Sequence, residues 1–256
     1  MSSVLLKSYC QRVITPNKKV KTVLNSIDFR VSKGEQVAIV GSSGAGKTSL
    51  LKALIFATKP SSGQMIFNKI NPWAVSKRAR HKLRKFVSFV PQEPPFPLRQ
   101  SVYHAILVGR LPTMNFFNSV QSMVQPLSVN DVTEVLRKVQ LSDKIGSRVD
   151  QLSGGERQRV SLARALISNA SFWDIDEPLS GLDPNLAEIV MRILCENAKM
   201  KRITFVCTLH HVEFALAYFP RIVGIKEGKI AFDLPVEEVT SSLLESTYKR
   251  REIDSF

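Results

Sequence analysis

Residues 41–48 read Gly41-Ser42-Ser43-Gly44-Ala45-Gly46-Lys47-Thr48 and match the pattern G-x-x-x-x-G-K-[ST] at every fixed position. The glycines let the backbone approach an anion without a Cβ in the way. Lys47 would reach the β- and γ-phosphates of a nucleotide as a point charge, and the Thr48 hydroxyl would bind Mg²⁺. This stretch therefore predicts a phosphate-binding loop for a nucleoside triphosphate.

The segments on both sides of this loop predict a strand before it and a helix after it. Gln36–Val40 is short and apolar, as a strand buried on both faces of a parallel sheet should be. From about Lys47 onward, apolar residues recur on one helical face: Leu50, Leu51, Leu54 and Ile55. The helix N-terminus would add backbone N–H groups and the positive end of its dipole to the anion site.

The composition favours one large α/β domain, or a core domain with an inserted lobe, because 256 residues can bury a sizeable core. Apolar runs are shorter than the ~18 residues of a membrane-spanning helix. Met1-Ser2-Ser3 opens no signal peptide, so we expect a soluble, cytosolic protein. Cys10, Cys195 and Cys207 are far apart and odd in number, which favours reduced structural thiols. The net charge of +14 fits an anionic partner, which is nucleic acid, the inner face of a membrane or the nucleotide itself.

Three further segments of the N-terminal half predict strands. Val4–Leu6 and Thr22–Val31 alternate polar and apolar residues enough to be antiparallel strands that lead into the buried strand. Phe86–Val90 follows a basic stretch, Lys77–Lys85, and ends just before Gln92.

A helical lobe with a second phosphate-binding end is predicted between residues 93 and 166. The pattern is mainly helical from Ser101 to Val139. Further on, Leu152-Ser153-Gly154-Gly155-Glu156 precedes an amphipathic helix that Ser153 can cap, and its two glycines leave the N–H groups open to an oxyanion. From this local chemistry alone, an ordinary capped helix is an alternative.

Two acids end the next predicted strand, within Phe172–Pro178. At the carboxyl edge of a parallel sheet, Asp176 is placed to hold Mg²⁺ through water. Glu177 can orient or deprotonate a water molecule for attack on the γ-phosphate. The alternative is a solvated acidic turn.

A helix and a strand follow these acids. Asp183 predicts an N-cap, with Pro184 as the first helical residue. Ile203–Leu209 predicts another buried strand, with His210 and His211 at its carboxyl end. Adjacent residues at a strand end face opposite sides, so only one of the two histidines can face a phosphate.

The order of these elements resembles the ATP-binding subunit of an ABC transporter from about Leu5 to Asp233. The resemblance implies that Gln92 senses Mg²⁺ and couples to a permease, that residues 152–156 are the signature, and that His210 contacts the γ-phosphate. It makes Lys47, Glu177 and His210 catalytic, and Thr48, Gln92 and Asp176 metal-binding. The nucleotide-binding residues would be Gly41, Ser42, Ser43, Gly44, Ala45, Gly46, Lys47, Thr48, Ser49, Gln92, Ser153, Gly154, Gly155, Glu156 and Asp183.

The fold implied by this resemblance is α/β: a P-loop NTPase core of the RecA type with an antiparallel N-terminal β subdomain and an inserted helical subdomain. One ABC ATP-binding domain would span 1–256. Its nucleotide-binding core would be 1–92 and 167–233, its helical lobe 93–166 and its C-terminal extension 234–256.

The resemblance also implies ATP and Mg²⁺ as cofactors. The implied partners are transmembrane permease subunits and, indirectly, a periplasmic solute-binding protein, with the chain peripheral on the cytoplasmic face of the cell membrane and no nucleic acid bound. A homodimer follows from the two phosphate-binding ends, which lie in different lobes. Two chains related by a two-fold axis would each close the other's ATP site.

Within that family, several stretches are similar to the phosphonate-import ATPases: Val108–Thr113 followed by an insert, Thr208–Leu216, Phe219–Gly224 and Gly228–Asp233. They imply import of a phosphonate, a phosphite or a phosphate ester. Import of another small solute is an alternative, and a soluble ABC-type ATPase acting on nucleic acid is a weaker one. A GTPase is disfavoured because Asn68–Asn71 lacks the acid of the guanine-reading motif.

Two features depart from the family pattern. The family usually stacks adenine on an aromatic residue in the loop before the second N-terminal strand, whereas the nearest candidates here are Val13, Ile14 and Tyr9. Asp174 faces the same side of its strand as Asp176. A third carboxylate there would raise its neighbours' pKa values or alter the metal field, but we favour a pairing of Asp174 with a nearby basic side chain.

Overall fold

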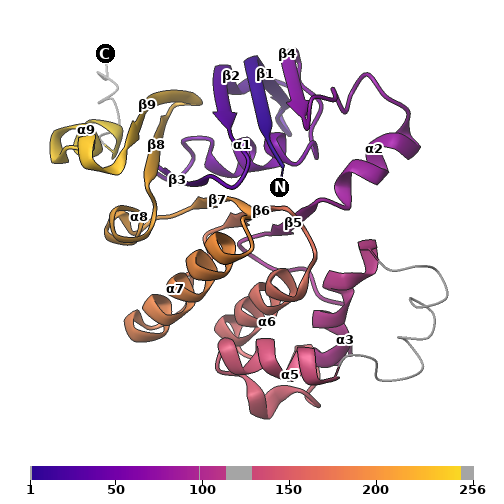
Figure 1. Cartoon of the computed structure of the whole chain (residues 1–256). Coiled ribbons are helices and arrows are strands. Elements are labelled where there is room, and N and C mark those ends of the chain that lie inside the picture. Colours follow the sequence, from indigo (N-terminus) through magenta and orange to yellow (C-terminus); the bar gives the residue numbers. More distant parts are fainter. Residues whose placement is uncertain (1, 98, 114–128, 249–256) are drawn as a thin grey trace.

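A six-stranded sheet forms the centre of the computed structural model, which describes residues 2–97, 99–113 and 129–248 (Figure 1). The strand order is β5-β6-β7-β3-β8-β9, and neighbouring strands are parallel except for the antiparallel pair β8 and β9. Most of these runs are short and apolar because both faces of the sheet are covered. The strands are β3 (Gln36–Val40), β5 (Val87–Val90), β6 (Phe172–Asp176), β7 (Thr204–Thr208), β8 (Arg221–Lys226) and β9 (Lys229–Pro235).

A second, antiparallel sheet has the order β2-β1-β4. Its strand β1 is longer than the predicted Val4–Leu6. The register of β1 shifts around Ser8, whose φ is 45°, and the pairing with β2 then resumes beyond this irregularity. The strands of this sheet are β1 (Val4–Ile14), β2 (Val20–Val31) and β4 (Ser62–Phe67).

Helices lie on both faces of the large sheet, and α1 begins at Lys47 as predicted. The α-helices are α1 (Lys47–Leu54), α2 (Lys77–Arg84), α3 (Val102–Leu107), α5 (Val129–Lys138), α6 (Gly154–Ile167), α7 (Pro184–Met200), α8 (Val212–Tyr218) and α9 (Ser241–Tyr248). Short 3-10 helices are η1 (Val108–Thr113), η2 (Ser142–Lys144), η3 (Val149–Gln151) and η4 (Val236–Glu238). No helix of the described residues is long and apolar enough to cross a lipid bilayer.

Two hydrophobic cores lie on opposite faces of the large sheet. One includes Leu50 of α1, Phe67 of β4 and Phe172 of β6, and joins the small sheet to α1 and the large sheet. The other includes Trp173 of β6 and Phe205 of β7 together with residues of α6 and α7. Phe172 and Trp173 enter different cores because neighbouring side chains of a strand point to opposite faces.

A helical lobe is formed by α3, α5 and α6, which pack on one another at the bottom of Figure 1. This lobe lies between β5 and β6 in the chain. The parallel core, the antiparallel N-terminal sheet and the inserted helices confirm the predicted fold class. The insert predicted after Thr113 falls on residues 114–128, which lie outside the described residues. The limits 93–166 and 234–256 stay a prediction.

The three cysteines carry free thiols, as predicted. Burial raises the pKa of Cys195 to about 12 and that of the fully buried Cys207 well above its ordinary value. Both thiols therefore stay protonated and unreactive at neutral pH.

Candidate nucleotide-binding and catalytic site

Four of the predicted polar residues gather with the phosphate loop at one edge of the large sheet, because the strands that lead to them are parallel neighbours. β3 leads into the phosphate loop, and its neighbour β7 leads to His210. β6, beside β7, ends at Asp176 and Glu177, and β5, beside β6, leads to Gln92. The carboxyl ends of parallel strands, where ligands bind in open α/β sheets, thus form a single site.

Glycine is required at two positions of the phosphate loop for different structural reasons. A Cβ on Gly41, whose φ is 152°, would lie 2.3 Å from the backbone oxygen of Ile225 on β8. Gly44 has a φ of 79° and open space where a Cβ would project, so its left-handed backbone selects glycine. Because α1 begins directly after Gly46, the loop and the helix N-terminus make a concavity with N–H donors that fits a phosphate group.

Lys47 lies over its own loop and is only 5% exposed. Its Nζ donates hydrogen bonds to the backbone oxygens of Gly41 at 2.8 Å and Ser42 at 3.3 Å. Burial lowers the pKa of the Lys47 ammonium, while the nearby carboxylates of Glu177 and Asp176 act in the opposite direction. The ammonium is placed to exchange these neutral acceptors for phosphate oxygens, with which charge-assisted bonds are stronger.

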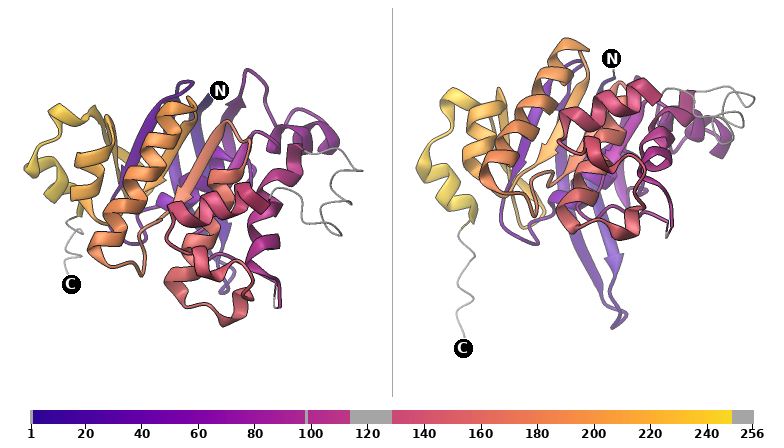
Figure 2. Two further views of the ribbon diagram at one scale, coloured as in Figure 1. Left: turned by 60° about the horizontal axis from the view of Figure 1, so that its bottom comes forward. Right: turned by 90° about the horizontal axis from the view of Figure 1, so that it is seen from below.

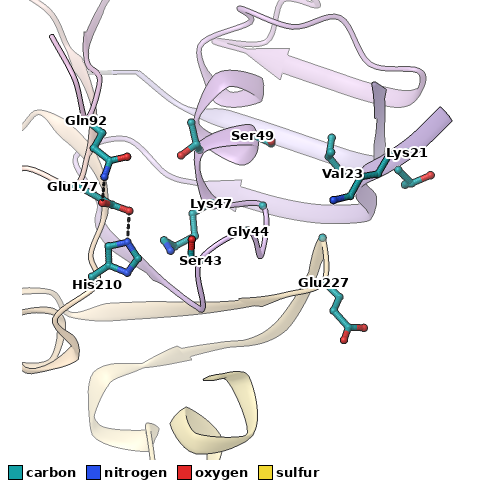
Figure 3. A pocket seen from close by; sticks show the side chains of 14 residues that line it. Lys21, Val23, Ser43, Gly44, Lys47, Ser49, Gln92, Glu177, His210 and Glu227 are labelled. Carbon is teal, nitrogen blue, oxygen red and sulfur yellow. Dashed lines mark hydrogen bonds and ion pairs between the residues drawn. The ribbon is translucent and has the colours of Figure 1, made fainter. Parts of the chain in front are cut away.

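Glu177 is held through both its backbone and its carboxylate. It has a left-handed φ of 50° just after β6, and its N–H donates to the Thr208 hydroxyl at 3.0 Å. One carboxylate oxygen accepts a hydrogen bond from Gln92 Nε2 at 2.6 Å, and the other lies 2.6 Å from His210 Nε2 (Figure 3). A left-handed backbone is unfavourable for a non-glycine residue and persists when the surrounding contacts hold it.

Only one of the two adjacent histidines reaches this carboxylate. His210 contacts Glu177, whereas Nδ1 of His211 lies 3.2 Å from Glu213 Oε1 and its side chain is 66% exposed. The structure therefore places His210, and not His211, beside Glu177.

Thr208 positions both acids, although sequence reasoning did not single it out. Its hydroxyl donates to Asp176 Oδ1 at 2.6 Å and accepts from the N–H of Glu177. Asp176 is 2% exposed, so this bond orients a nearly buried carboxylate. A signal was available, because Thr208 is a hydroxyl residue near the carboxyl end of a strand predicted to be buried.

A cavity of about 460 Å³ lies in front of the phosphate loop. Predicted residues that line it are Ser43, Gly44, Gly46, Lys47, Thr48, Ser49, Gln92, Glu177 and His210. Gly41, Ser42, Ala45 and Asp176 are not among its lining residues. Residues that line it without having been predicted are Lys21, Thr22, Val23, Glu227 and Gly228; Figure 3 shows Lys21, Val23 and Glu227 across the cavity from Glu177.

The side of the cavity that the sequence did not predict is formed by β2 and the β8–β9 turn, two segments far apart in the chain. The N–H of Gly228, in the β8–β9 turn, donates to the Ala45 oxygen at 2.8 Å, and the Gly228 oxygen accepts from Asn25 on β2 at 2.8 Å. A Cβ on Gly228 would lie 2.5 Å from the Val23 oxygen. Nothing in the local sequence distinguishes this turn from another hairpin turn, so only the folded chain shows its role.

The three candidates for adenine stacking do not line this cavity. Tyr9 is fully buried, and its hydroxyl donates to the Thr58 oxygen at 3.2 Å. Val13 and Ile14 are exposed on β1 but are not lining residues. Among the described residues that line the cavity none is Phe, Trp or Tyr, so aliphatic groups such as Val23 and the stem of Lys21 form the available wall.

The signature stretch begins α6 with a reciprocal cap. The Ser153 hydroxyl accepts from the Glu156 N–H at 3.2 Å, and the Glu156 carboxylate accepts from the Ser153 N–H at 2.8 Å. These bonds, the backbone one first, lower the pKa of Glu156. A Cβ on Gly155 would lie 2.9 Å from the Gly181 oxygen, so glycine permits this close approach.

The signature faces a different hollow from that of the phosphate loop. This second hollow, of about 750 Å³, is lined by Gly154 and Gly155, and Gln92 borders both cavities. Ser153, Glu156 and Asp183 line neither. Asp183 instead caps α7, accepting from the Leu186 N–H at 3.0 Å, with Pro184 at the first position as predicted.

Asp174 does not pair with a basic side chain, contrary to our expectation. It is fully buried, and neither carboxylate oxygen has a hydrogen-bond partner in the described part of the chain. Its neighbours on the adjacent strands are Phe89 and Val206, so the position lies in an apolar core where cations are excluded. Burial first, and the Asp176 carboxylate second, raises the pKa of Asp174 well above its ordinary value.

Comparison with known proteins gives matches to a family model, to curated relatives and to solved structures. The model of the ABC transporter family matches residues 24–180. The chain is 49% identical over 225 residues to the phosphonates import ATP-binding protein PhnC 2 of Albidiferax ferrireducens, covering 88% of this chain and 81% of that protein. The phosphonates import ATP-binding protein PhnC of Polaromonas sp. is 45% identical over 225 residues, which again cover 88% of this chain and 81% of that protein. A solved dimeric ATP-binding cassette bound to ADP and Pi has a TM-score of 0.79 at 24% identity, covering 91% of this chain and 98% of that one.

A parallel sheet with a phosphate loop after β3 and acids at the end of β6 defines a P-loop nucleotide-binding protein. Within this class, the chain belongs to the ABC transporter family and is an ATP-binding subunit, since the family model spans more than half of it and relatives match most of its length.

Proposed function

We propose that this chain hydrolyses MgATP to drive uptake of a phosphonate, a phosphite or a phosphate ester through membrane permease subunits. The observation that carries the hydrolysis is the Glu177 carboxylate, held between Gln92 and His210 at the cavity that the phosphate loop lines. The solute class is supported by the relatives, which are named phosphonates import ATP-binding proteins.

Each side chain of the site has a separate role in the proposed hydrolysis of ATP. Lys47 and the N–H groups of the phosphate loop bind and neutralise phosphate oxygens. Glu177 orients the attacking water and accepts its proton, which typically contributes on the order of 10²–10⁴ in rate. His210 contacts the γ-phosphate and keeps the Glu177 carboxylate in place, as its 2.6 Å contact supports.

Mg²⁺ fits the oxygen donors at this edge of the sheet. The described residues contain no group of three or more His, Cys, Asp or Glu side chains placed to hold a metal. Mg²⁺ characteristically takes few protein ligands and completes its shell with phosphate oxygens and water. Thr48, Gln92 and Asp176 would hold it, and it would supply charge neutralisation on the phosphates.

The separation of the two hollows supports a head-to-tail homodimer. In one chain the signature glycines line a different hollow from that of the phosphate loop. Two copies related by a two-fold axis would place each signature against the other copy's ATP. Release of that contact after hydrolysis would move the helical lobe as a rigid body and pass the motion to the permease on the cytoplasmic face of the membrane.

The test is reconstitution in vesicles with the permease and the solute-binding protein encoded by neighbouring genes. We expect ATP-dependent uptake of a phosphonate, phosphite or phosphate ester, and ATPase stimulation by the loaded binding protein. Stimulation by a different small solute would support the importer function and contradict the proposed class of solute. ATPase stimulation by DNA or RNA without a permease would instead establish the alternative of a soluble, nucleic-acid-dependent ATPase.

A further inference from the structure

Helix α2 and the residue after it carry a continuous cationic face. At 100° per residue, six exposed basic residues fall within an arc of roughly 160°: Lys77, Arg78, His81, Lys82, Arg84 and Lys85. Leu83, on the opposite side, is 8% exposed and packs against the protein. Arg80 lies outside this arc and stacks on Trp73 at 4.5 Å, which fastens the helix to the loop before it.

None of the six basic residues forms an ion pair with an acidic side chain of the described residues, unlike Arg110, Arg148 and Arg221 elsewhere. No acidic residue interrupts the sequence from Lys77 to Lys85 either. Like charges held this close repel one another until counterions or an anionic partner neutralise them. The face therefore presents an unmatched positive field to whatever lies opposite it.

The position of α2 connects this face with the helical lobe. A small cavity of about 150 Å³ is lined jointly by Lys85, by Val108 of η1 and by Arg164 of α6. In Figures 1 and 2, α2 lies beside α3 and far from α9. Phe86, which directly follows Lys85, is 46% exposed. If the helical lobe meets the permease, as the proposed function requires, α2 lies beside that contact.

We propose that the cationic face of α2 binds the anionic phospholipid headgroups of the cytoplasmic leaflet next to the permease; this inference rests on the proposed function. The five Lys and Arg charges of this face are spread over an open helix surface. They match a plane of phosphates better than they match a single carboxylate of a protein partner. Each Lys or Arg near an anionic leaflet adds to the attraction. Exposed Phe side chains such as Phe86 accompany basic helices that lie at a membrane interface.

The experiment measures binding of the purified chain to phosphatidylcholine vesicles with and without phosphatidylglycerol. The test variant is Arg78→Glu/Lys82→Glu/Lys85→Glu. The matched control, Lys18→Glu/Lys33→Glu/Lys199→Glu, changes the net charge equally at exposed positions elsewhere. We expect the wild type and the control to bind phosphatidylglycerol vesicles in a salt-sensitive way. The α2 variant should bind at least about tenfold more weakly than the control, with basal ATPase activity unchanged in all three.

Equal losses in the α2 variant and the control would show attraction by net charge alone and would overturn the proposal. It would also be overturned if the α2 variant bound vesicles normally but no longer assembled with the permease in detergent, since the face would then serve a protein partner. If the chain binds vesicles through α2 but phosphonate uptake fails, the result would contradict the proposed solute class. It would not contradict the proposed membrane binding by the cationic face of α2.

Discussion

Gln92 donates a hydrogen bond of 2.6 Å to the carboxylate of Glu177, a residue 85 positions further along the chain. Gln92 also borders the second hollow, where the signature glycines lie. One residue therefore borders both the proposed catalytic carboxylate and the region that the proposed dimer and permease contacts would use. A shift of the loop after Gln92 would change the hydrogen bonding of Glu177 directly.

Replacing Glu177 by Gln should abolish turnover and preserve ATP binding. The amide keeps the shape of the side chain but cannot accept a proton from water, so kcat should fall on the order of 10²–10⁴. ATPase assays and binding of a fluorescent ATP analogue measure the two effects separately. Hydrolysis at close to the wild-type rate would remove Glu177 from the role of base.

Replacing His210 by Ala should reduce hydrolysis far more than replacing His211 by Ala. His210 contacts the carboxylate of Glu177, the proposed base, whereas His211 lies beside the exposed Glu213. Paired measurements of kcat for the two variants make the comparison, with His211→Ala as the matched control. A greater loss in His211→Ala would shift the assignment by one residue.

Mixing inactive Lys47→Ala chains with inactive Ser153→Arg chains should restore part of the ATPase activity. A heterodimer of these chains contains one composite site with an intact phosphate loop and an intact signature. The readout is ATPase activity against mixing ratio, with each variant alone as the control. The shared-site mechanism would be abandoned if the mixture recovered nothing and Glu177→Gln protein stayed monomeric at saturating MgATP.

Replacing the buried Asp174 by Val should stabilise the protein by about 1–3 kcal/mol, because the change removes a polar group that has no hydrogen-bond partner among the described residues. Val also suits a strand. Asp174→Asn serves as the control, because it keeps a buried polar group and should gain much less. Urea unfolding measures both free energies. Destabilisation by both changes would mean that the carboxyl group makes a favourable interaction in the folded protein.

The features predicted well were those governed by residues close together in the chain. The start of α1 at Lys47 follows from the local backbone of Gly46, which has no side chain to cap the helix. The Ser153 cap of α6 and the Asp183 cap of α7 each depend on a side chain that bonds a backbone N–H three residues away. The apolar runs of the parallel strands carried their own signal as well, because burial on both faces demands continuous hydrophobicity.

The predictions that failed or were missing concern partners distant in sequence. Asp174 was expected to find a cation, but the sheet places it between Phe89 and Val206. Thr208 holds both acids only because β6 and β7 are neighbours. Gly228 reaches the phosphate loop only because β8 lies beside β3.

Side-chain chemistry and local periodicity were enough to predict the phosphate-binding loop Gly41–Thr48, the alternation of strands and helices, and the acids and histidines at the strand ends. The tertiary structure decided which of these groups meet. Strand order selects the neighbours of each strand end, and it brings Gln92 and His210 onto Glu177. It also keeps the signature in a separate hollow. The reason is that strand pairing is settled by the burial of whole faces, a quantity that no short stretch of sequence contains.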